Sequence, residues 1–145
     1  RVDIAQIAAQ QLQQIGMDVT IEIPAQVDWG GQMAYLIGWG SPFDADDHTY
    51  KVFGTDKGAN YSGYSNEKVD EYLTLARQYE DQETRAKYYD LFQEELAKDP
   101  AYAFICYIDA NYVADSDIKG ISEKTVLGHH GVGIFWNIQE WEIVK

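Results

Sequence analysis

The sequence predicts an α/β domain with a mixed sheet and flanking helices. Three observations lead to this fold class. The chain begins with an amphipathic helix pattern that is followed directly by an alternating strand pattern. It contains two nearly continuous apolar runs, which are typical of strands buried on both faces. Two consecutive amphipathic helices lie between those runs.

The first α/β unit covers residues 2–23. Apolar residues recur at helical spacing over 2–15, glutamines occupy the other face, and Gly16 provides a C-terminal stop. Over 17–23 apolar and polar residues alternate with period two. This alternation predicts a strand with one buried face, which ends at Pro24.

The two apolar runs predict central strands. Residues 33–39 are bounded by glycines, and residues 101–108 contain the single cysteine, Cys106. We expect Cys106 to be a small core residue, and a single cysteine excludes an internal disulfide. Shorter extended pieces are predicted at 118–121 and within 135–144.

Three helices are predicted between the apolar runs. The first covers 46–53. Ser65 or Asn66 caps the second helix. Asp81 caps the third, which ends where Pro100 approaches. The last two helices have apolar inner stripes, formed by Val69, Tyr72, Leu73, Ala76 and Tyr79 and by Tyr88, Leu91, Phe92 and Leu96.

The composition excludes several classes of partner. The chain carries 24 acidic and 11 basic residues, a net charge of −13, so it repels phosphate backbones and anionic membrane surfaces. No apolar run is long enough for a membrane span. The 145 residues are predicted to form a single domain. Because they open on a helix pattern without a leader, we expect them to be a piece of a longer protein.

The loop after the first buried strand is the predicted ligand edge. In open α/β sheets, ligands bind in the crevice at the carboxyl ends of the strands. Trp39 would cover an apolar or aromatic part of a ligand, and Asp44 would meet an amine or a cation. The alternative is that Trp39 belongs to the core and Asp44 caps a turn. The residues at this edge are Trp39, Pro42, Phe43, Asp44 and Asp46.

Elsewhere the sequence offers little chemistry. It lacks GxSxG, a Walker loop, GxGxxG before a helix and HExxH, and it predicts no cofactor. Asp44, Asp46 and Asp47 offer general acid–base chemistry or form a solvated acidic loop. Tyr61 and Tyr64 are expected to pack within their loop rather than to contact a ligand.

One histidine pair has metal-binding potential. The adjacent imidazoles of His129 and His130 can reach a common ion, with His48 completing the coordination. The alternative is two exposed loop histidines.

The order of several short motifs resembles that of the extracytoplasmic solute-binding proteins of peptide/nickel-type ABC transporters. Each motif alone is weak, but together they cover nearly the whole chain. They are Leu12-Gln13-Gln14-Ile15-Gly16, then Trp29, Gly38-Trp39, the set Asn60, Tyr64, Asn66 and Asp70, then Arg85 and Gln93, and finally Trp141.

The resemblance implies the C-terminal lobe of a type II periplasmic-binding-protein fold. In such proteins two lobes clamp a solute by a hinge motion and deliver it to ABC permease subunits, and no reaction is catalysed. The implied partners are a peptide or small-solute ligand, the N-terminal lobe and the permease, at an extracytoplasmic location. Neither nucleic acid nor direct membrane insertion is expected. An acid–base hydrolase and a protein-interaction module are the competing classes.

The resemblance implies peptide uptake first. For peptides, the family commonly places a carboxylate three residues after the tryptophan, where this chain has Pro42. The alternative is a nickel or metal chelate, because the string from Ser41 to Asp44 is similar to the nickel branch, which often reads Pro-Tyr-Asp-Pro-His. The histidine expected there is absent, and His48 lies two positions on. Trp29, which matches a loop tryptophan of the family, is a further candidate ligand contact.

Overall fold

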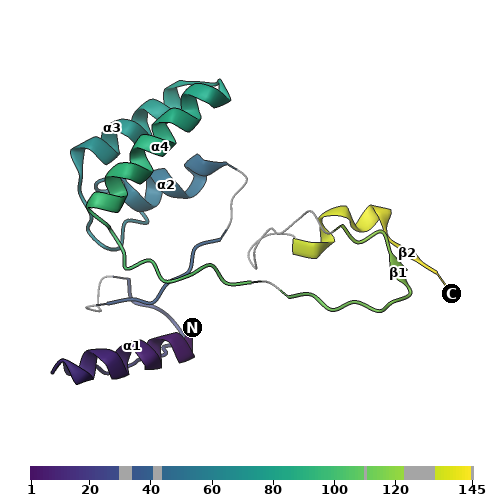
Figure 1. The fold of residues 1–145 in the computed structure, drawn as a ribbon, viewed down its shortest axis with the longest axis horizontal. Helices are drawn as coiled ribbons and strands as arrows, with labels where there is room; N and C mark the ends of the chain where they lie inside the picture. Colours follow the sequence, from purple (N-terminus) through teal and green to yellow (C-terminus); the bar gives the residue numbers. More distant parts are fainter. Residues whose placement is uncertain (30–33, 41–43, 110, 123–132, 145) are drawn as a thin grey trace. The chain divides into compact units, whose positions relative to one another are not determined.

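The computed structural model describes residues 1–29, 34–40, 44–109, 111–122 and 133–144. These residues form two compact units, Arg1–Gly38 and Trp39–Lys145, and each is described by itself. The elements in chain order are α1 (Val2–Gln14), α2 (Ala45–Phe53), α3 (Glu67–Gln78), α4 (Gln82–Lys98), β1 (Ile118–Lys119), the 3-10 helix η1 (Gly133–Glu140) and β2 (Glu142–Ile143) (Figure 1).

Helix α1 confirms the first predicted helix and its stop. The amide of Gly16 donates to the carbonyl of Gln13 at 3.0 Å, and the amide of Met17 donates to that of Leu12 at 3.1 Å. These two bonds satisfy carbonyls that the end of a helix leaves without partners. They require a left-handed residue, and Gly16 has a φ of +88°.

Helices α2, α3 and α4 form a helical cluster whose starts are set by capping side chains. The Asn66 side chain accepts from the amides of Lys68 and Val69 at the start of α3, and Asp81 accepts from Thr84 at the start of α4. Both caps agree with the prediction. Helix α4 ends at Lys98, before Pro100, also as predicted.

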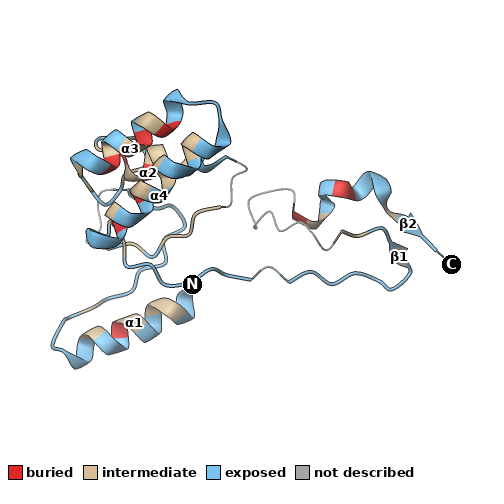
Figure 2. Cartoon of the chain, turned by 45° about the horizontal axis from the view of Figure 1, so that its top comes forward, coloured by how far each residue is buried: buried red, intermediate tan, exposed pale blue. Residues whose placement is uncertain are grey.

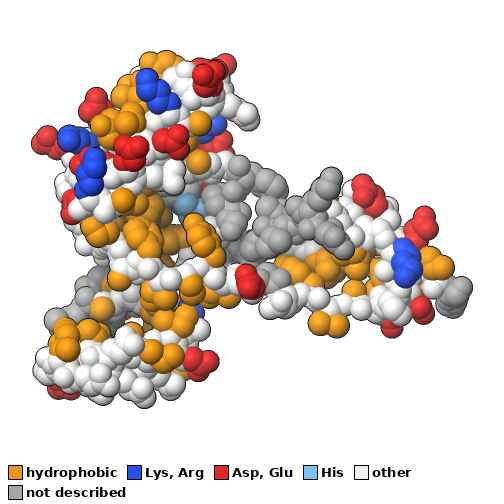
Figure 3. All heavy atoms as spheres, viewed as in Figure 1, with side chains coloured by type: hydrophobic (Ala, Val, Ile, Leu, Met, Phe, Trp, Pro, Cys, Tyr) orange, Lys and Arg blue, Asp and Glu red, His pale blue; other side chains and the backbone are white. Residues whose placement is uncertain are grey.

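The core of the helical cluster lies between α3 and α4. Buried Val69, Leu73, Phe92 and Leu96 form one apolar cluster, and Val52 of α2 and Ala76 of α3 are also buried. Burying each larger side chain contributes about 1.5–3 kcal/mol. Figure 2 shows the buried positions on the inner faces of these helices, and Figure 3 shows acidic and basic side chains interspersed over their outer surface.

One member of the predicted inner stripe is not in the core. Tyr79 is 41% exposed. Helix α3 ends one residue earlier, and Tyr79 has extended backbone angles (φ −107°, ψ 141°), so its side chain no longer follows the helical stripe. It instead stacks on Tyr88 of α4, with ring centroids 5.5 Å apart.

The predicted central strands do not form in the described part of the chain. Residues 17–23, 34–39 and 101–108 have no β-ladder, and the described sheet is the antiparallel pair β1–β2. A strand needs a neighbour to satisfy its backbone hydrogen bonds, and none of these runs meets one among the described residues. The extended piece predicted near 118–121 is confirmed by β1, with Ile118 opposite Ile143.

The run around Cys106 is exposed instead of buried. Phe104, Ile105 and Ile108 are all more than half exposed, and Tyr107 is fully exposed. Cys106 is exposed too, so the prediction that it is a core residue is wrong. No described strand pairs with this run, and residues 103–109 stay exposed although the Phe53 ring of α2 lies 5.8 Å from that of Tyr102 and 6.5 Å from that of Phe104 (Figure 2).

Around β1 and β2, one buried polar side chain organises the backbone. Asn137 is 1% exposed, and its amide nitrogen donates to the carbonyl of Gly120 at 2.8 Å and to Glu140 at 3.0 Å. Its oxygen accepts from the indole N–H of Trp141 at 3.1 Å. The motif residue Trp141 therefore has a packing role here. No helix in the described residues combines the length and the apolar character that crossing a bilayer requires.

Candidate functional site

Trp39 is the centre of a small aromatic cluster. Its indole stacks on Tyr61, with ring centroids 6.1 Å apart and an angle of 10° between planes, and it packs on His48 at 5.7 Å. His48 lies on α2, and Tyr61 lies in the loop between α2 and α3. Trp39 is partly exposed, so its side chain is not sealed in a core. We call Trp39, His48 and Tyr61 the aromatic cluster.

Two polar atoms of the aromatic cluster lack a hydrogen-bond partner among the described residues. The indole Nε1 of Trp39 and the imidazole Nδ1 of His48 are both shielded from solvent. The acid nearest to that imidazole nitrogen is Asp47, with its carboxylate oxygen at 3.7 Å. A shielded polar atom without a partner costs about 1–3 kcal/mol. A ligand that supplies an acceptor to the indole and a partner to the imidazole would remove that cost.

The loop that carries Tyr61 is closed by Asn60. The amide nitrogen of Asn60 donates to the carbonyls of Gly54 at 3.0 Å and Tyr64 at 2.7 Å. Its oxygen accepts from the amide of Tyr64 at 3.0 Å and from the hydroxyl of Ser62 at 3.2 Å. These bonds hold the backbone on both sides of Tyr61, so the motif residue Asn60 anchors the loop that carries the Tyr61 ring.

The other residues of that motif also hold this loop. The Asp70 carboxylate on α3 accepts from the amide of Thr55 at 2.8 Å, and Asn66 caps α3. The motif is thus a set of backbone anchors that connects the loop to α3.

The predicted ligand acids Asp44 and Asp46 are both held by arginines. The Asp44 carboxylate accepts a hydrogen bond from the backbone amide of Asp46 at 2.8 Å and another from the Arg85 guanidinium of α4 at 2.7 Å. Asp46 pairs with Arg77 of α3 at 3.2 Å. The hydrogen bond from Arg85, followed by that from the Asp46 amide, holds the pKa of the Asp44 carboxyl below its ordinary value. Much of the charge predicted to face a ligand amine is therefore neutralised within the protein.

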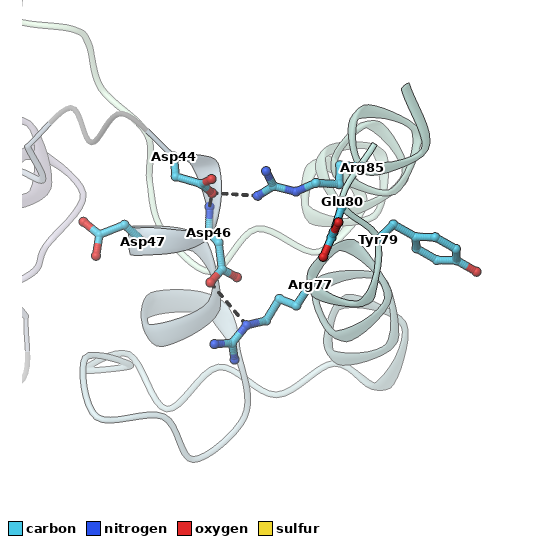
Figure 4. Close-up of a pocket in the computed structure, with 7 residues that line it drawn as sticks. All are labelled: Asp44, Asp46, Asp47, Arg77, Tyr79, Glu80 and Arg85. Atoms are coloured by element: carbon cyan, nitrogen blue, oxygen red, sulfur yellow. Dashed lines mark hydrogen bonds and ion pairs between the residues drawn. The ribbon is translucent and has the colours of Figure 1, made fainter. Parts of the chain in front are cut away.

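These charged groups line an open hollow beside the start of α2 (Figure 4). Figure 4 shows Arg85 and Arg77 reaching toward Asp44 and Asp46, while the Tyr79 ring points away. The described residues hold no group of three or more His, Cys, Asp or Glu side chains arranged for a metal ion. The lining residues are Asp44, Asp46, Asp47, Arg77, Tyr79, Glu80 and Arg85.

The structure brings several predicted site residues together. Trp39 and His48 meet in the aromatic cluster, and Asp44 and Asp46 line the open hollow at the start of α2. Trp29 lies in the unit Arg1–Gly38, where its ring packs on Tyr35 at 5.3 Å. The remaining predicted site residues lie outside the described part of the chain. They are Pro42, Phe43, His129 and His130.

Sequence reasoning missed two contributors to this region. Tyr61 was expected to pack in its loop, but its ring stacks on Trp39. Its position directly after the motif residue Asn60 was the available signal. Arg77 has no such signal, because a basic residue in the last turn of a helix is ordinarily explained by the helix dipole.

No family model matches the chain, but the chain is similar to a curated protein and to a solved structure. Over all of its length, in an alignment of 159 residues, it is 26% identical to the oligopeptide-binding protein AppA of Bacillus subtilis (strain 168). A solved structure, that of NikZ from Campylobacter jejuni in complex with Ni(L-His), matches 98% of the chain with 37% identity and a TM-score of 0.77. The chain spans 27% of the length of AppA and 30% of that of NikZ. These similarities confirm the resemblance to peptide- and nickel-type solute-binding proteins that the motifs indicate.

Proposed function

We propose that this chain is a ligand-binding part of an extracytoplasmic substrate-binding protein of the peptide/nickel ABC transporter type. The observation that carries the proposal is the match of nearly the whole chain to both AppA and NikZ. Residues 1–145 then form a C-terminal lobe, which acts with an N-terminal lobe of the same protein and with ABC permease subunits. The protein captures a solute and does not catalyse a reaction.

Trp39 is the proposed centre of ligand contact. It is partly exposed, it lies next to His48 and Tyr61, and its indole N–H has no acceptor among the described residues. An aromatic face beside a free donor suits a ligand with an apolar group next to a polar one. Trp29 is proposed as a second contact, on the basis of its match to a family motif. The proposed edge also includes Pro42, Phe43, Asp44 and Asp46.

A peptide is the first candidate ligand, in keeping with the similarity to an oligopeptide-binding protein. A peptide offers backbone carbonyls to the Trp39 indole N–H and side chains to its ring. The pairing of Asp44 and Asp46 with arginines leaves them less able to bind a free peptide amine, so recognition by backbone hydrogen bonds is favoured.

A nickel chelate is the second candidate, and one observation favours it. The Nδ1 atom of His48 has no hydrogen-bond partner among the described residues and lies in the aromatic cluster, and imidazole is a good nickel ligand. The solved structure of NikZ holds Ni(L-His). In this version His48, His129 and His130 are the candidate ligands of the metal.

Calorimetry on the full-length protein tests both candidates. Wild-type protein is titrated with a set of short peptides and, separately, with nickel plus L-histidine. We expect Trp39→Ala to lower the affinity for whichever ligand binds wild type by about tenfold or more, which corresponds to about 1.4 kcal/mol or more of binding free energy. Trp136→Ala is the matched control, since Trp136 is 43% exposed and lies on η1. Unchanged affinity in Trp39→Ala would remove Trp39 from the site.

His48→Ala separates the two candidate ligands. If the chelate is the ligand, we expect His48→Ala to abolish tight nickel–histidine binding. If a peptide is the ligand, we expect only a partial loss of peptide affinity, because the variant removes one ring that packs on Trp39. The double variant His129→Ala/His130→Ala is titrated in parallel, and unchanged nickel affinity there would exclude this pair as ligands.

A further inference from the structure

The first turn of α2 is held from two sides. Its N-cap residue Asp44 pairs with Arg85 in the first turn of α4, and Asp46 pairs with Arg77 in the last turn of α3. Figure 4 shows the two guanidinium groups approaching this turn from neighbouring helices. The two acids are separated by one residue, while their arginines come from different elements, so the pairs constrain both the position and the direction of the helix start.

Each arginine has further contacts that fix it in place. The guanidinium of Arg77 lies 4.0 Å from the centroid of the Tyr50 ring, so Arg77 contacts α2 at both Asp46 and Tyr50, one helical turn apart. The guanidinium of Arg85 lies 5.8 Å from the ring of Tyr89 on its own helix. An isolated exposed ion pair contributes little to stability, but side chains that are ordered by stacking lose less entropy when they pair.

Asp44 connects this anchoring to the helix itself. One carboxylate oxygen of Asp44 accepts both from the amide of Asp46 and from Arg85, at 2.8 and 2.7 Å. The group that begins α2 is therefore the group that Arg85 holds. If Arg85 is removed, the cap and the helix start lose their connection to α4.

The aromatic cluster depends on where α2 begins. His48 lies in the first turn of α2, and Trp39 is five residues before Asp44 in the chain. Tyr61 comes from the loop beyond the other end of α2 and is fixed by Asn60. A shift of the helix start would move His48 against Trp39, whereas Tyr61 is tied through Asn60 to Gly54 at the other end of α2.

We propose that Arg85 and Arg77 are positioning residues that clamp the start of α2, so that Trp39 and His48 keep the arrangement in which a ligand is bound. Asp44 and Asp46, which belong to the proposed ligand edge, also act through this clamp. The effect on ligand affinity rests on the proposed function. The effect on the arrangement of the aromatic cluster is independent of the proposed function.

The test uses full-length protein labelled with 5-fluorotryptophan and observed by 19F NMR. The Trp39 resonance is assigned by its absence from Trp39→Phe. We expect Arg85→Gln to shift or broaden this resonance and the double variant Arg77→Gln/Arg85→Gln to do so more strongly. Lys87→Gln, which removes an exposed charge from the same helix, should leave it unchanged. Arg85→Lys should restore most of the wild-type signal, because it keeps the charge.

Affinity for a ligand bound by wild type is measured on the same variants. We expect a loss of about five- to tenfold in Arg85→Gln and little loss in Lys87→Gln. If Arg85→Gln does not fold, wild type and Arg85→Lys in about 1 M salt provide the comparison, because screening there acts over about 3 Å. A salt-dependent shift of the Trp39 resonance then supports the clamp.

The two proposals fail in different ways. An unchanged Trp39 resonance in the double variant overturns the proposed clamp, whatever the measured ligand affinity is. A moved resonance with unchanged affinity overturns the role of the clamp in binding. If neither peptides nor nickel–histidine bind wild type, the proposed function fails, while a moved resonance still supports the clamp on the aromatic cluster.

Discussion

Two apolar regions of this chain end in opposite environments. The helical cluster buries Val69 and Leu73 completely, whereas the segment 103–109 is exposed throughout, although both regions are rich in apolar residues. A helix satisfies its backbone hydrogen bonds internally and needs a partner for one face only. An extended segment needs neighbours for its backbone as well as for its side chains. In this chain, apolar composition therefore predicts burial for the helices, which satisfy their backbone hydrogen bonds internally. It does not predict burial for the extended segment, which depends on neighbouring strands.

Hydrogen exchange should show the largest contrast between the two regions. In the chain Arg1–Lys145 we expect the amides of α3 around Leu73 to exchange only when the helical cluster unfolds globally. Amides of 103–109 should exchange with almost no protection. Mass spectrometry of peptides from both regions measures the difference. In the full-length protein, strands from the remainder of the proposed receptor should protect 103–109. Strong protection of this segment in the shorter chain would contradict the comparison.

The loss of stability caused by truncating an apolar side chain should differ between the same two regions. Leu73→Ala removes a fully buried side chain and should lower the free energy of unfolding by about 2–5 kcal/mol. Ile105→Ala is the matched control in the exposed segment, where the change should stay within about 0.5 kcal/mol. Urea unfolding of the chain measures both. Equal losses would show that Ile105 is buried in solution.

Asn60 offers a sharper test of how the helical cluster holds its loops. Asn60→Ala removes hydrogen bonds to Gly54, Ser62 and Tyr64, and we expect a loss of about 1–3 kcal/mol in the free energy of unfolding. Ser62→Ala removes one of these bonds at an exposed position and serves as the control. A loss in Ser62→Ala as large as that in Asn60→Ala would argue against Asn60 as the anchor of the loop.

The smallest expected effect concerns pH and the cap of α4. Hydrogen bonds from Thr84 lower the pKa of Asp81 below its ordinary value, so the carboxylate favours the folded state. This stability is fully present above the pKa of the unfolded chain, about 3.9, and is lost as pH falls through the lower folded value. Urea midpoints of wild type and Asp81→Asn should therefore converge as pH is lowered from 6 toward 3 (roughly the span of carboxyl titration).

Sequence patterns predicted the helices well because the groups that fix them are close in the chain. Asn66 and Asp81 accept hydrogen bonds from amides two or three residues ahead, and Gly16 allows the backbone turn that ends α1. Such local partners can be identified from residue type and spacing alone. The same patterns placed Trp39, Asp44 and Asp46 at one edge, because they follow one another in the chain.

Long-range contacts decided what those residues do. Arg85 lies 41 positions from Asp44, and no local pattern predicts that this guanidinium will occupy a carboxylate expected to meet a ligand. The stacking of Tyr61 on Trp39 likewise depends on the loop that Asn60 closes. The predicted strands at 17–23, 33–39 (described from residue 34) and 101–108 depend on neighbours that the described residues do not include.

The amino-acid sequence by itself determined the helices, their caps and the resemblance to solute-binding proteins, because each rests on residues within a few positions of one another or on the order of short motifs. Only the tertiary structure decided that the acids are held by Arg77 and Arg85 and that Trp39 lies against His48 and Tyr61. Electrostatic pairing and ring stacking depend on distance in space, and that distance is set by how α2, α3 and α4 pack.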